Sequence, residues 1–171
     1  MLLLLDTSTP TAFVALSSGG GILFSEENAQ AKEHASWLHP AIRRLLEQAG
    51  AGMDGQADMG SREKAGLGMK ALQAVAISAG PGSYTGLRVG MAAAKGICYA
   101  LKIPLITVNT LQLMAEAMAP LAKEKNALIC PMIDARREEV FTAVYAADMK
   151  EIRAPQALIL EKTSFEEILR E

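Results

Sequence analysis

The residues best suited to chemistry lie where two short apolar runs of the sequence end. Asp6, Thr7 and Ser8 follow the apolar run 2–5, and Gly80 and Gly82 follow a second run that begins at position 74. A strand, a glycine-rich turn and a helix start form a setting in which free backbone N–H groups bind phosphate. These five residues are therefore a candidate nucleotide site. The alternative is a tight turn whose glycines serve backbone geometry alone.

The known phosphate and nucleophile motifs do not fit this corner. The Gly-x-x-x-x-Gly-Lys-Ser/Thr motif does not occur, and in the Gly-x-Gly-x-x-Gly pattern Gly86 stands one position late. A nucleophile elbow requires glycines two residues before and two residues after its serine, but Ser83 has Pro81 and Thr85 at those positions. The enzyme alternatives that remain are a hydrolase or peptidase that uses Ser83 and an ATPase that uses Asp6.

Histidine and cysteine usage gives no sign of a metal centre. His34 and His39 are the two histidines, and a spacing of five places them on different faces of a helix. Cys98 and Cys130 show neither a disulfide framework nor the spacing of metal ligands. We therefore expect no catalytic residue and no metal, with both cysteines as small buried side chains in a reducing compartment.

Composition and charge place the chain among ordinary folded proteins. It has 171 residues, a net charge of −2, a pI near 5.8 and 50% apolar residues. This balance provides no overall positive field for nucleic acid or anionic membrane. The apolar start ends at Asp6, far short of a signal peptide or a membrane span. We expect a cytoplasmic location and no membrane contact.

An unusual helix follows the glycine corner. The hydroxyl of Ser83 or Thr85 can cap its first turn by accepting a free backbone N–H. Gly86 and Gly90 are four apart and share one helical face. Each costs about 1 kcal/mol relative to alanine inside a helix. We infer that another backbone approaches this face closely.

The order of the predicted elements indicates an α/β fold with a duplicated unit. Strands over 2–5, 11–17 and 22–26 precede a helix over 36–48 that Gly50 ends. Strands over 127–133, 140–146 and 152–160 precede a helix capped by Thr163. Asp6 and Asp134 end the first strand of each copy, where they could hold magnesium between two lobes or simply cap turns. The predicted lobes are 1–109, with an inserted loop over about 51–70, and 110–171.

Three segments of this sequence resemble the TsaB (YeaZ) family, the TsaD-related, glycoprotease-like accessory subunits of tRNA threonylcarbamoyladenosine biosynthesis. They are 1–9 (MLLLLDTST), 80–90 (GPGSYTGLRVG) and 103–108 (IPLITV). A looser match includes the first-helix pattern His34, Ser36, Leu38, Pro40, Ile42, Leu45 and Leu46, and residues 133–136. The resemblance implies the actin-like ATPase-superfamily (ASKHA, ribonuclease H-like) fold in two lobes.

The resemblance also implies a role without catalysis. The family's catalytic relative, TsaD, carries two metal-binding histidines where this chain has Thr110 and Met114, and neither residue replaces a histidine as ligand. We therefore expect a pseudoenzyme subunit that binds and activates TsaD for threonylcarbamoyl transfer to adenosine 37 of tRNA. Its other partners would be a TsaE-like ATPase and, through the complex, tRNA. ATP or ADP and metal would belong to that complex, with no cofactor in this subunit.

The family's helices after the first strands and after the glycine corner form a bundle with TsaD or with a second TsaB. Alone, the chain would form a homodimer through the same helices, so a homodimeric scaffold is a further alternative. The interface expected on this ground comprises Trp37, Leu38, Ile42, Leu45, Gly86, Leu87, Gly90, Met91, Ala93, Ala94 and Ile97.

Overall fold

The computed structural model describes residues 1–30, 33–54, 60–122, 124 and 126–166. The chain divides into two compact units, Met1–Val108 and Asn109–Glu171. Among the described residues, none of the helices combines the length and the apolar character needed to cross a membrane.

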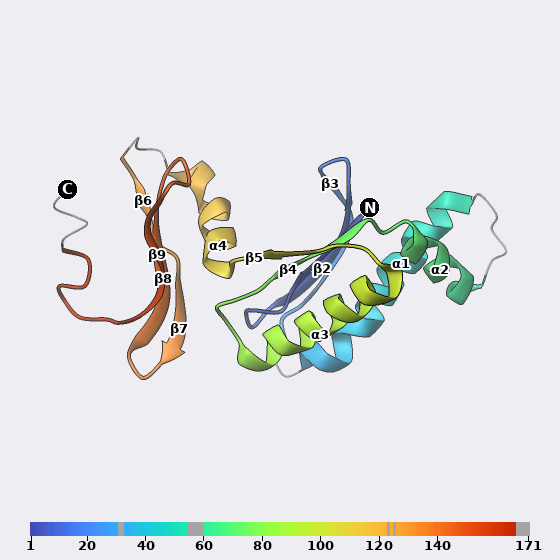
Figure 1. Cartoon of the computed structure of the whole chain (residues 1–171), viewed down its shortest axis with the longest axis horizontal. Helices are drawn as coiled ribbons and strands as arrows, with labels where there is room; N and C mark the ends of the chain where they lie inside the picture. The colour runs from blue at the N-terminus through green and yellow to red at the C-terminus, as the bar shows by residue number, and fades with distance from the viewer. Residues whose placement is uncertain (31–32, 55–59, 123, 125, 167–171) are drawn as a thin grey trace. The chain divides into compact units, whose positions relative to one another are not determined.

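The first unit is built on a five-stranded mixed sheet with the order β3-β2-β1-β4-β5 (Figure 1). Three strands form an antiparallel meander and two continue it in parallel with β1. Their bounds are β1 Leu2–Asp6, β2 Ala12–Ser18, β3 Gly21–Asn28, β4 Ala74–Ser78 and β5 Leu105–Val108. The apolar runs of the sequence therefore form strands close to where they are predicted. The α/β class is confirmed.

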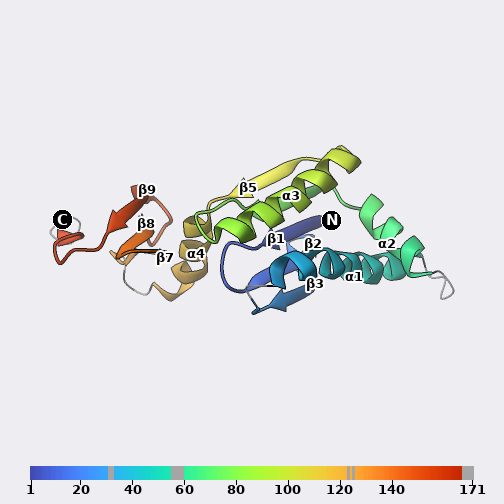
Figure 2. The same ribbon diagram turned by 90° about the horizontal axis from the view of Figure 1, so that it is seen from below.

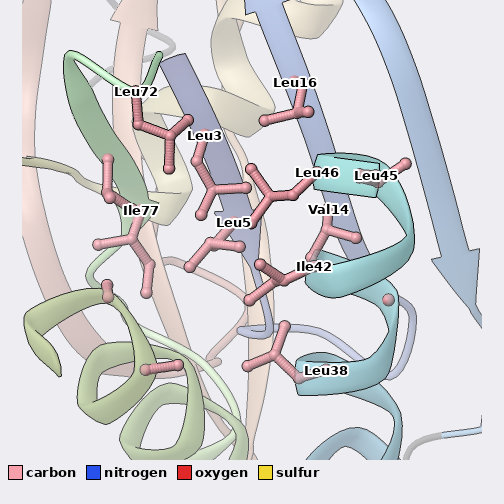
Figure 3. Close-up of a cluster of buried hydrophobic side chains, with 14 of the residues drawn as sticks. Leu3, Leu5, Val14, Leu16, Leu38, Ile42, Leu45, Leu46, Leu72 and Ile77 are labelled. Carbon is pink, nitrogen blue, oxygen red and sulfur yellow. The ribbon is translucent and has the colours of Figure 1, made fainter. Parts of the chain in front are cut away.

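Two long helices, α1 (His34–Asp54) and α3 (Tyr84–Leu101), lie side by side against this sheet (Figure 2). The apolar stripe of α1 points at the sheet, where Leu38 and Ile42 meet Leu5 and Val14 (Figure 3). Burial of such side chains contributes about 1.5–3 kcal/mol each. The stripe and the apolar side chains of the sheet and α3 together form the core of the unit.

The helix prediction for 36–48 is too short, and the predicted loop over about 51–70 is wrong. Helix α1 continues through Gly50 to Asp54, and a further helix, α2, spans Ser61–Lys70. Residues 55–59 of the predicted loop lie outside the described part. The apolar residues of this stretch lack a period because α2 buries little, with Gly68 as its one fully buried residue.

The glycines that suggested a helix end and a loop are contact points between α1 and α2. A Cβ added to Gly50 would lie 1.9 Å from the backbone oxygen of Lys64. A Cβ added to Gly68 would lie 2.2 Å from the backbone oxygen of Leu46. Only glycine allows two helix backbones to approach so closely.

In its described residues, the second unit is built from helix α4 (Thr110–Met118) and an antiparallel sheet. Helix α4 and a 3-10 turn (Ala119–Leu121) lead into β6 (Leu128–Ile129), β7 (Met132–Arg136), β8 (Glu139–Ala146) and β9 (Glu151–Ile159). The predicted strand over 127–133 is broken at Cys130 and Pro131, and both of its parts pair with β8. Pro131 provides no N–H for a sheet ladder, which explains the break. Most of the helix predicted after Thr163 lies outside the described residues.

Candidate functional site

The turn after β4, at residues 80–82, has a backbone conformation that favours glycine. Gly80 has φ +107° and Gly82 has φ +156°, and the Gly80–Pro81 peptide bond is cis. Ser83 is the N-cap of α3, and its Oγ accepts a hydrogen bond from the N–H of Gly86 at 3.3 Å. Of the two capping residues that the sequence allows, the structure uses Ser83.

The close approach predicted at Gly86 and Gly90 is real, but the chain's own Thr7 makes it. A Cβ on Gly86 would lie 2.0 Å from the backbone oxygen of Thr7, and one on Gly90 would lie 2.3 Å from Thr7 Oγ1. Thr7 Oγ1 also donates a 2.7 Å hydrogen bond to the backbone oxygen of Gly86. The glycine face of α3 therefore packs on the end of β1 and is closed to an outside partner.

Asp6 is a structural acceptor at the same corner. Its Oδ1 accepts hydrogen bonds from Ser8 N at 2.8 Å, Ser8 Oγ at 2.6 Å and Ser78 Oγ at 2.6 Å. Because Ser78 ends β4, this carboxylate joins the ends of two parallel strands. Three donors on one oxygen are typical of a carboxylate with a structural task.

Of the five candidate nucleotide residues, Ser8 contacts both Asp6 and Gly82, whereas Gly80 faces Leu87. Thr7 and Ser8 are 0% and 1% exposed, and Ser83 N donates to the backbone oxygen of Ser8 at 2.7 Å. A Cβ on Gly82 would lie 2.3 Å from that same oxygen. These contacts show that the residues hold the corner together.

The described residues give no support to the hydrolase alternative. Ser83 Oγ caps α3, while His34 Nε2 lies 3.0 Å from the backbone oxygen of Pro10. Within the described residues, Ser83 shares no hydrogen bond with an imidazole. Nor do these residues contain a group of three or more histidine, cysteine, aspartate or glutamate side chains that could hold a metal ion.

Most residues of the expected interface lie inside the first unit. The buried ones are Leu38, Ile42, Leu45, Gly86, Gly90, Ala93 and Ala94. Trp37, Met91 and Ile97 are half-buried against the same core, and Leu87 is half-buried beside Gly80. The apolar stripe of α1 and the small-residue face of α3 face the sheet because this sheet supplies their partner.

The opposite face of α3 is exposed and carries side chains that the sequence prediction left out. Tyr84 and Tyr99 are 69% and 89% exposed. Arg88 lies over the ring of Tyr84 at 4.1 Å from the centroid, and Lys95 is exposed further along the helix. Residues 84, 88, 92, 95 and 99 follow helical spacing, so they form one outer face of α3.

A groove of about 450 Å³ runs along this outer face. It is lined by Ala79 and, from α3, by Tyr84, Leu87, Arg88, Met91, Ala92 and Lys95. Its lining combines apolar side chains with a tyrosine, an arginine and a lysine. Aromatic residues, methionine and arginine are enriched at protein–protein interfaces. The groove can therefore receive a helix or an extended segment of another protein.

Comparison with known proteins places the chain in a family. Residues 61–162 match the family model described as "TsaD: tRNA N6-adenosine threonylcarbamoyltransferase". The tRNA threonylcarbamoyladenosine biosynthesis proteins TsaB of Haemophilus influenzae and Bacillus subtilis are 34% and 31% identical over 140 and 144 residues. These matches cover 82% and 84% of this chain and 51% and 54% of those proteins. The chain belongs to the TsaB family.

A solved structure agrees with the TsaB assignment. YeaZ from Pseudomonas aeruginosa has a TM-score of 0.74 and 29% identity, over 94% of this chain and 68% of that one. The chain spans about half the length of the curated TsaB relatives it matches. The resemblance drawn from the glycine corner is thereby confirmed.

One signal in the sequence could have revealed the outer face. Between Glu63 and Glu116 this TsaB chain has no acidic residue, although its net charge is −2. Arg88 and Lys95 lie inside that acid-free stretch, on the helix that follows the glycine corner. Charge counted segment by segment, together with Tyr84 and Tyr99 at helical spacing from Arg88 and Lys95, would have pointed to this side of the helix.

Proposed function

We propose that this TsaB-family chain takes part in the biosynthesis of threonylcarbamoyladenosine at position 37 of tRNA, as a non-catalytic subunit. It would bind and activate a TsaD-type subunit, which performs the threonylcarbamoyl transfer. The observation that carries the proposal is the 34% identity to a protein named for this biosynthesis. The two-lobed actin-like architecture of the family is part of the same proposal.

The residues at the start of α4 support the absence of catalysis in this chain. Thr110 and Met114 lie one turn apart on α4, at the positions that the family resemblance assigns to the metal-binding histidines of TsaD. A hydroxyl and a thioether are poor substitutes for imidazole in an iron or zinc site. Nucleotide and metal would accordingly belong to the partner complex, which would include a TsaE-like ATPase and would contact tRNA.

The outer face of α3 is the surface through which we propose that the TsaD-type subunit docks. Within the first unit it combines an apolar groove with exposed aromatic side chains on a rigid helix. The cytoplasm is the proposed location, as expected for tRNA modification. The interface residues retained from the sequence are Leu87 and Met91, which line the groove.

The test is binding to the TsaD-type protein of the same organism, followed by measurement of the modified nucleoside. Ala92 is exposed and lines the groove, so Ala92→Trp should fill the groove and weaken binding about tenfold or more. The matched control is Ala51→Trp, which adds the same bulk at an exposed position of α1. In a strain that relies on this chain, Ala92→Trp should lower threonylcarbamoyladenosine in hydrolysed tRNA, measured by mass spectrometry.

Two results would contradict the proposal. One is that the wild-type chain shows no binding to the TsaD-type protein and its removal leaves the tRNA modification unchanged. The other is turnover of a peptide, an ester or ATP by the isolated chain that disappears in Ser83→Ala or Asp6→Asn.

A further inference from the structure

We draw no further inference here: the strongest candidate, the apolar hollow of about 540 Å³ that α4, the 3-10 turn and β6 line in the second unit, carries none because nothing in the described residues shows what covers it.

Discussion

The two faces of α3 are made of different residues and perform different tasks. The inner face consists of glycine and alanine and is pressed against Thr7 and the sheet. The outer face consists of tyrosine, arginine and lysine around a shallow groove. Small residues mark where the chain packs on itself, and large exposed residues mark where another protein can dock.

This difference shows how a correct physical inference can reach the wrong surface. Glycines on one helical face do require a close neighbour, but the neighbour of Gly86 is the backbone of Thr7. The same holds on the neighbouring helices, where Gly50 and Gly68 bring α1 and α2 together. In the described part of this chain, close-approach glycines indicate internal contacts.

Among the substitutions considered, Gly86→Ala should disrupt the packing of the inner face of α3 most strongly. Its new Cβ would lie 2.0 Å from a backbone oxygen that cannot move without displacing β1, so we expect a loss of about 3 kcal/mol or more in the free energy of unfolding. The control is Gly96→Ala on the same helix, where no atom lies within 4 Å of the new Cβ. This control should stabilise by about 0.5–1 kcal/mol through helix propensity. Urea denaturation measures both, and equal stabilities would contradict the assignment of the inner face.

A second substitution tests whether a glycine also marks a close internal contact between α1 and α2. Gly68→Ala would place a Cβ 2.2 Å from the backbone oxygen of Leu46, so it should cost about 1–3 kcal/mol and separate α2 from α1. Gly66→Ala on the same helix meets nothing within 4 Å and should stabilise α2 slightly. Hydrogen exchange of the α2 amides reports the difference. Unchanged protection in Gly68→Ala would show that the two helices are not tightly packed.

The outer face should behave in the opposite way. Tyr99→Ala removes a side chain that is 89% exposed, so stability should change by less than about 0.5 kcal/mol. Binding to a TsaD-type subunit should nevertheless weaken about tenfold if this tyrosine reaches the partner, since exposed tyrosines are frequent binding hot spots. A melting curve and a binding isotherm on the same sample separate the two effects. A large loss of stability with normal binding would reverse the assignment of the two faces.

The smallest effect concerns the thiol of Cys98, a buried residue in the last turn of α3. Burial raises the pKa of this thiol above its usual value, against a smaller opposing effect of a backbone hydrogen bond at Val75. Because the unfolded chain releases this proton at lower pH than the folded chain does, stability is full below about pH 8.5 and falls as pH rises above it. Cys98→Ala should flatten this fall, and urea denaturation between pH 7.5 and 10 would detect it. An identical slope in the variant would mean that the thiol is not buried.

The sequence predicts the strands well because each one is a short apolar run bounded by turn residues. It also predicts the corner, since Gly80, Pro81 and Gly82 leave little choice of backbone. It misses α2, because this helix is held in place by the contact between Gly68 and α1. No local sequence pattern encodes that contact. The family resemblance assigns Leu38, Ile42 and Leu45 to a partner, and the amphipathic stripe alone shows that one face is buried without showing what buries it.

The hydrogen bonds at Asp6 and Thr7 have a consequence for any partner of α3. Asp6 ties the end of β1 to Ser78, and Thr7 holds the first turn of α3 through the backbone oxygen of Gly86. The helix start is thus anchored to two neighbouring strands before a partner arrives. A preorganised surface loses less conformational entropy on association than a mobile one does. Weakening this anchor, for example with Thr7→Val, should therefore slow the formation of a complex even though the side chain of Thr7 is buried.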